Sequence, residues 1–88
     1  MLEKEVTIRN KVGLHARPAG AFVQIAGNFK ADIAVVKDGT RVNGKSIMGL
    51  MMLAAEKGSQ LTIITDGPDE TEALAALVAL VDAKFDEE

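Results

Sequence analysis

The stretch GLHARPAG, residues 13–20, holds the only histidine of this 88-residue chain and places an arginine two positions after it. An imidazole, with a reference pKa of about 6.5, is partly unprotonated near neutral pH and can then act as a nucleophile. The chain has no cysteine and no second histidine, so we expect no metal site and no cofactor. No serine or carboxylate beside His15 suggests a catalytic triad. These residues indicate that His15 itself would carry any chemistry.

A helix expected directly after His15 would place an anion site there. If the helix begins at Ala16, then His15 is its N-cap and Pro18 falls in the first turn, where a missing N–H is tolerated. The unpaired N–H groups and the positive end of the helix dipole favour negative charge. Arg17 adds a cation with donors suited to phosphate oxygens.

A phosphoryl group on a ring nitrogen would bring nearly two negative charges to this helix start. The surroundings of His15 would stabilise that charge without further catalytic residues, as a carrier requires. Gly13 and Gly20 keep bulk low on either side, which would let a partner approach. The residues alone leave a second interpretation open, in which His15 is a surface side chain without a role.

The elements that must position His15 follow from periodicity. Alternation in residues 2–9 and the short apolar run QLTIIT predict strands, and Asp38-Gly39 divides residues 31–44 into a hairpin. Helical spacing predicts a first helix ending near residues 27–28, and a second from a Ser46 N-cap to Gly58. The order β-α-β-β-α-β-α predicts an α+β fold with a four-stranded, mostly antiparallel sheet covered by helices on one side.

The last predicted helix has its own start signal and its own buried stripe. Asp69 and Glu72 stand at capping-box spacing. The predicted stripe consists of apolar residues at helical spacing: Leu74, Leu77, Val78, Val81 and Phe85.

Composition limits the class of protein. The length predicts a single domain, residues 1–88, and the one-sided core predicts a monomer. A net charge of −3 without clustered lysine and arginine argues against a nucleic-acid partner. No apolar run reaches the roughly 20 residues of a membrane span, and the charged N-terminus does not resemble a signal peptide. Without cysteine, we expect a cytoplasmic protein with no membrane association.

The helix after Ser46 has no polar face over its first two turns. A short helix on one side of a sheet buries about half of its girth, so some of these side chains should be exposed. Methionines suit a surface that meets several partners. The alternative is that all of the apolar residues fill the core: Ile47, Met48, Leu50, Met51, Met52 and Leu53.

The segment GLHARPA closely resembles the phosphorylation site of the HPr family, the phosphocarriers of the phosphoenolpyruvate:sugar phosphotransferase system. The segment KSIMGLMML resembles the second signature of that family. The resemblance implies that His15 accepts a phosphoryl group at Nδ1 from phosphorylated Enzyme I and passes it to a histidine of IIA domains, with Arg17 neutralising the phosphate. It also implies an open-faced β-sandwich with strand order 1-4-2-3 and three helices on one face.

The same resemblance gives Ser46 a second role besides capping. It implies a regulatory phosphoserine, made by the HPr kinase/phosphorylase. It further implies an exposed partner-binding surface close to His15, which we expect to include five residues: Ala16, Gly20, Ile47, Met48 and Met51.

The sequence is also compatible with other functions within this family. Val12 stands where many relatives carry a small polar residue, and the C-terminal segment resembles the nitrogen-related branch, NPr. The sugar and nitrogen branches are therefore both compatible with the sequence. A purely regulatory relative acting through phosphorylated Ser46 is a further alternative, which the presence of His15 and Arg17 disfavours. A small acyl phosphate hydrolase would need a phosphate loop that we do not recognise here.

Overall fold

A computed structural model describes residues 1–86 of the chain, so the last two residues of the predicted 1–88 domain lie outside the described part. Its elements, in chain order, are β1 (Leu2–Thr7), α1 (Ala16–Ala26), β2 (Asp32–Lys37), β3 (Thr40–Asn43), α2 (Ile47–Met52), β4 (Gln60–Asp66) and α3 (Glu70–Asp82), and a 3-10 turn (Lys84–Asp86) follows.

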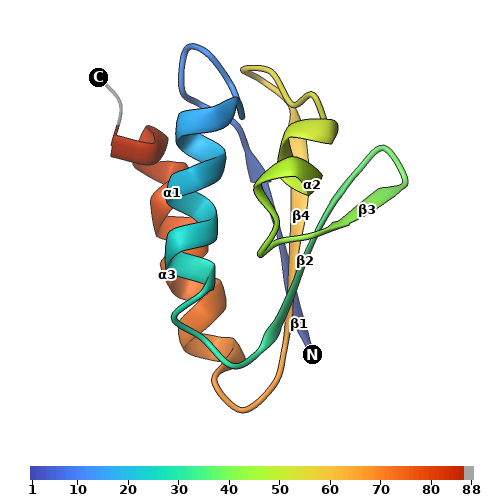
Figure 1. Cartoon of the computed structure of the whole chain (residues 1–88), viewed down its shortest axis with the longest axis vertical. Coiled ribbons are helices and arrows are strands. Elements are labelled where there is room, and N and C mark those ends of the chain that lie inside the picture. Colours follow the sequence, from blue (N-terminus) through green and yellow to red (C-terminus); the bar gives the residue numbers. More distant parts are fainter. Residues whose placement is uncertain (87–88) are drawn as a thin grey trace.

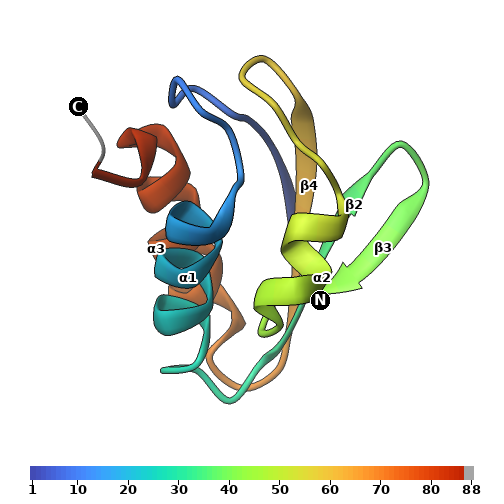
Figure 2. The same ribbon diagram turned by 45° about the horizontal axis from the view of Figure 1, so that its top comes forward.

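The four strands form one antiparallel sheet in the order β1-β4-β2-β3. The three helices cover one face of this sheet and leave the other face open (Figures 1 and 2). The α+β class, the element order and the strand order implied by the resemblance are therefore confirmed. The β2–β3 hairpin turns at Asp38 and Gly39, whose φ angles of 50° and 82° are the positive values that a tight hairpin requires.

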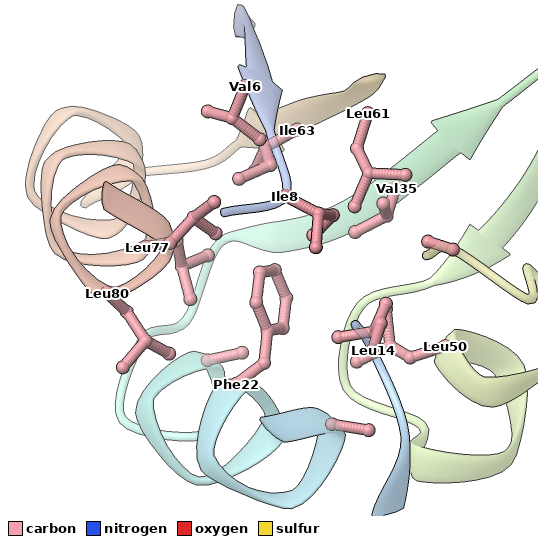
Figure 3. Close-up of a cluster of buried hydrophobic side chains, with 14 of the residues drawn as sticks. Val6, Ile8, Leu14, Phe22, Val35, Leu50, Leu61, Ile63, Leu77 and Leu80 are labelled. Carbon is pink, nitrogen blue, oxygen red and sulfur yellow. The ribbon is translucent and has the colours of Figure 1, made fainter. Parts of the chain in front are cut away.

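The core lies between the sheet and the helices. Phe22 of α1 is 2% exposed and occupies the middle of the cluster, between the strands and the side chains of α3 (Figure 3). Leu77 of α3 and Ile63 of β4 are fully buried in the same cluster. On the open face, exposed Glu3 and half-buried Ile64 are directly opposite one another in neighbouring strands. This layering places the start of α1 at one end of the molecule and the N-terminus at the other (Figure 1).

Two elements are shorter than the sequence predicted. The first strand ends at Thr7, although Ile8 still donates its N–H to Ser59 O at 2.8 Å. The second helix has six residues and ends at Met52, far before Gly58. It ends because Leu53 turns into the core, where it is 5% exposed, and Ala54 adopts a left-handed φ of 51°.

The last helix differs from its prediction at both ends. Asp69 makes no side-chain cap bond to α3, so the predicted capping box does not form. Its carboxylate instead accepts the N–H groups of Lys30 and Ala31, both at 2.8 Å, and so joins the start of α3 to the start of β2. Of the predicted stripe, Leu74 and Val78 are only half-buried.

Phe85 is buried as predicted, but it lies beyond α3. It belongs to the 3-10 turn and has a positive φ of 56°. Phe85 therefore reaches the core because the backbone changes conformation after α3, and not because the helix continues to this residue.

Candidate functional site

The loop before His15 is fixed by contacts within the protein. Leu14 is buried and donates its N–H to Ala55 O at 2.8 Å. The side-chain amide of Asn10 donates to Gly13 O at 2.7 Å. Gly13 has a φ of 74°, and a Cβ there would lie 2.5 Å from Ala55 O. Gly13 is thus required for this internal packing, and the interpretation that it leaves room for a partner is wrong.

His15 is the N-cap of α1, as the sequence predicted. Its backbone is extended, and its carbonyl accepts the first helical hydrogen bond from Ala19 N at 2.9 Å. The imidazole is exposed and makes no cap hydrogen bond to the helix. Pro18 is buried in the first turn, and it contributes no N–H at a position where a helix leaves donors unpaired.

The electrostatics of this helix start favour an anion. The first turn of α1 holds no acidic residue, and the exposed Arg17 adds a positive charge to that of the helix dipole. The backbone N–H groups of Ala16 and Arg17 precede the first intrahelical bond, so α1 itself provides them with no acceptor. One turn further along, a Cβ added at Gly20 would meet nothing within 4 Å.

Ser46 caps α2, as the sequence predicted. Its Oγ accepts the N–H of Gly49 at 3.1 Å, and its side chain is half-buried. The neighbouring Lys45 donates through Nζ to Phe29 O at 2.8 Å, which ties the start of α2 to the segment after α1. Ser46 therefore has a structural role as the cap of α2.

Four apolar side chains of α2 are exposed, and we call them the methionine patch: Ile47 (44%), Met48 (75%), Met51 (43%) and Met52 (76%). Only Leu50 and Leu53 reach the core, at 0% and 5% exposure. The alternative that all six residues fill the core is therefore wrong. A contiguous exposed group of this kind on a small protein is typical of an interaction surface.

A surface hollow of about 260 Å³ connects His15 with the methionine patch. His15, Met51 and Ala54 line it, so the start of α1 and the end of α2 meet there. Val12, which is 59% exposed, lines its other side. The five predicted partner-binding residues do not include Val12 or Met52, which are both exposed, although Met52 belongs to the apolar run of which part was expected at the surface.

No group of metal-ligating side chains is present among residues 1–86. None of the helices described in that range is long and apolar enough to cross a membrane.

Comparison with known proteins defines the class of this chain. Residues 2–83 match the family model described as "PTS HPr component phosphorylation site". The chain therefore belongs to the HPr family of phosphocarrier proteins of the phosphotransferase system.

Individual relatives cover nearly the whole chain. The phosphocarrier protein HPr of Cupriavidus necator is 52% identical over 87 residues, which is 99% of this chain and 98% of the relative. The HPr-like protein Crh of Halalkalibacterium halodurans is 54% identical and covers 93% of this chain, with 98% of its own length matched. The crystal structure of HPr-C-His from Thermoanaerobacter tengcongensis superposes with a TM-score of 0.96 at 50% identity, covering 100% of this chain and 99% of its own.

Dimeric relatives contradict the reasoning that predicted a monomer. One similar structure is an HPr dimer from Thermoanaerobacter tengcongensis, with a TM-score of 0.79 at 49% identity, and another is a Crh dimer, with a TM-score of 0.72 at 50% identity. A one-sided core does not prevent association, because the open sheet has edges at β1 and β3. The dimers of these relatives therefore conflict with the prediction of a monomer.

Proposed function

We propose that this protein is a phosphocarrier that accepts a phosphoryl group on His15 from phosphorylated Enzyme I and passes it to a histidine of IIA domains. The observation that supports this most is the position of His15. Its exposed imidazole stands at the start of α1 in a chain of the HPr family, with Arg17 beside it and no acidic residue in the first turn.

The transfer needs only one nucleophile. The lone pair of Nδ1 of His15 attacks phosphorus, and a P–N bond forms as the bond between phosphorus and Enzyme I breaks. Arg17 and the N-terminus of α1 stabilise the negative charge that arrives. Attack by the acceptor histidine of a IIA domain then breaks the P–N bond, and the imidazole of His15 is restored.

Partners would dock on the surface around the hollow. The methionine patch supplies the apolar centre, and exposed Ala16 with half-buried Gly20 lets a partner lie close to α1. Of the predicted partner-binding residues, Ile47, Met48 and Met51 belong to this patch. Methionine side chains adapt to differently shaped partners, as a carrier with both a donor and an acceptor requires.

Ser46 is the proposed regulatory position, as a substrate of an HPr kinase/phosphorylase. A phosphate there would add about 1.5 to 2 negative charges directly beside Ile47 and Met48. Charge at the centre of an apolar docking surface opposes binding, because it must be desolvated when a partner docks. Phosphorylation of Ser46 should therefore weaken docking rather than the chemistry at His15.

A second candidate function has support from the Crh relative. A regulatory protein acting through phosphorylated Ser46 alone would share the fold and the methionine patch. The presence of His15 and Arg17 at the start of α1 favours the carrier. Whether the carrier serves the sugar branch or the nitrogen branch depends on which Enzyme I phosphorylates it.

The test is intact mass after incubation with phosphoenolpyruvate and Enzyme I, followed by acid or alkali. The carrier gains one phosphate that is lost in acid, survives alkali and is not formed by His15→Ala. Failure with the sugar-branch enzyme but success with the nitrogen-branch enzyme assigns the protein to the second branch. Failure with both, together with phosphorylation of Ser46 by the kinase, supports the regulatory protein instead.

A further inference from the structure

A groove of about 390 Å³ runs between β1 and α3, away from His15 and the methionine patch. Leu2 and Lys4 of β1 line one side, and Leu74, Val78 and Asp82 of α3 are on the other. Leu74 and Val78 are the two members of the predicted stripe that the core does not fully bury. Helix α3 therefore carries apolar surface that its own fold leaves only partly covered.

The groove lies beside an open edge of the sheet. β1 is the first strand in the order β1-β4-β2-β3, so it pairs with β4 on one side only. In an antiparallel strand, alternate residues point their N–H and C=O groups away from the existing partner. An extended peptide can bond to such an edge and place every second side chain in the neighbouring groove.

The charge on β1 indicates which peptide would fit. Glu3 and Glu5 are exposed on the open face of the sheet. The side chains of an added strand that do not enter the groove would point to this face and lie beside the two glutamates. Basic residues at those positions would pair with the two glutamates. One register of a second copy is disfavoured, because antiparallel pairing of two β1 strands about Lys4 would set Glu3 of one copy against Glu5 of the other.

We propose that β1 and the groove beside α3 bind an extended segment of a partner protein in which apolar residues alternate with lysine or arginine. The segment adds to the sheet as a fifth, antiparallel strand. Its apolar side chains contact Leu74 and Val78, and its basic side chains lie beside Glu3 and Glu5. This surface does not include His15, so the segment would bind in addition to phosphoryl transfer and independently of it.

The probe is a capped seven-residue peptide that alternates lysine and valine, titrated into the ¹⁵N-labelled full chain. We expect NMR shift changes in β1 and in the groove-facing side of α3, and slower hydrogen exchange at alternate amides of β1. Glu5→Lys should weaken binding by about tenfold, because an attractive cross-strand pair becomes a repulsive one. The matched control is Glu72→Lys, which makes the same charge change at an exposed position of α3 outside the groove.

A second variant tests the apolar half of the site. Val78→Thr keeps the size of the side chain but adds a hydroxyl group, and it should weaken binding several-fold. The proposal is overturned if the peptide does not bind, if a glutamate-for-lysine peptide binds equally well, or if the shifts fall on the methionine patch. Protection of β1 that grows with protein concentration and needs no peptide would identify a second copy as the occupant, and would also overturn it. His15→Ala leaves every expected result unchanged, so a failure here is distinct from a failure of the carrier function.

Discussion

The starts of α1 and α2 differ in how the N-cap side chain treats the unpaired backbone N–H groups of the first turn. The N-cap of α2 is Ser46, whose Oγ accepts a backbone N–H at 3.1 Å and whose side chain is half-buried. The N-cap of α1 is His15, whose exposed imidazole makes no cap bond. The side chain of Ser46 therefore caps its helix, whereas that of His15 makes no cap hydrogen bond to α1.

The residues that follow each cap extend this difference. After His15, α1 presents a small residue and a cation, Ala16 and Arg17. After Ser46, α2 presents the exposed apolar Ile47 and Met48. An anion is favoured at the first helix start and an apolar partner surface at the second, and the hollow beside Met51 joins the two. In the proposed carrier, the phosphoryl group would therefore bind at the start of α1, and the apolar part of the docking surface would lie on the neighbouring α2.

The largest effect is expected from His15→Ala, which removes the nucleophile. Phosphoryl transfer from Enzyme I should be abolished. The free energy of unfolding should change by less than about 0.5 kcal/mol, as is usual for exposed positions. Transfer is measured by intact mass and stability by urea denaturation. Loss of stability comparable to that of a cap removal would contradict the contrast between the two helix starts.

Met48→Ser tests whether the patch on α2 serves docking. We expect kcat/KM for transfer from phosphorylated Enzyme I to fall by about tenfold, because the few interface residues that each contribute more than about 1 kcal/mol cluster near the centre of an interface, where we place Met48. Met48→Leu is the matched control and should retain transfer, since it preserves the apolar volume. Both variants should unfold like the parent protein, because Met48 is 75% exposed. Equal transfer by all three proteins would show that Met48 has no role in docking.

Both helix starts were predictable from the sequence because capping is a local property. His15 before Pro18, and Ser46 before an apolar run, are signals that need only a few neighbouring residues. The Asp38-Gly39 hairpin is equally local, since its backbone angles depend on those two residues. The order of the strands, by contrast, came only from the resemblance to the HPr family.

The features that the sequence missed depend on contacts between distant segments. Helix α2 ends early because Leu53 turns into the core, and the short-range pattern of residues 47–58 contains no sign of this. Gly13 is required by the carbonyl of Ala55, which is far along the chain. Asp69 bonds to the backbone of Lys30 and Ala31 rather than to its own helix. In each case a contact with a distant segment determines the structure, and the prediction from neighbouring residues was therefore wrong.

Ser46→Ala should give the reverse of the result for His15. The free energy of unfolding should fall by about 1 kcal/mol, because the N–H of Gly49 loses its acceptor. Phosphoryl transfer to His15 should remain close to that of the parent protein. Ser46→Asp replaces the hydroxyl oxygen of the cap with a carboxylate oxygen that can also accept the N–H of Gly49, so stability should be restored while docking weakens. Urea denaturation and transfer kinetics on the three proteins separate the two effects, and full stability of Ser46→Ala would contradict the cap.

The smallest effect on stability is expected at the start of α3. Its N-cap residue, Asp69, accepts N–H groups of the segment before β2 instead of those of its own helix. The pKa of this carboxyl is lowered from its ordinary value of 3.8, first by the hydrogen bond from Lys30 N and then by that from Ala31 N, against the opposing effect of desolvation. A lowered pKa in the folded state means that the ionised form stabilises the fold. This contribution is complete above the unfolded pKa and is lost as the pH falls through the folded one.

Asp69→Asn should therefore unfold at a lower temperature than the parent protein at pH 7, because one of the two N–H groups loses its acceptor. The difference between the two should begin to shrink below about pH 4, where Asp69 of the unfolded parent chain becomes protonated, and should go on shrinking as the pH falls towards the lower pKa of the folded protein. Glu70 also has a lowered pKa, through the N–H of Gly67 first, but it is present in both proteins and cancels in the difference. Thermal unfolding from pH 7 to pH 3 measures this. A difference in unfolding temperature that does not depend on pH would mean that the charge of Asp69 does not contribute to stability.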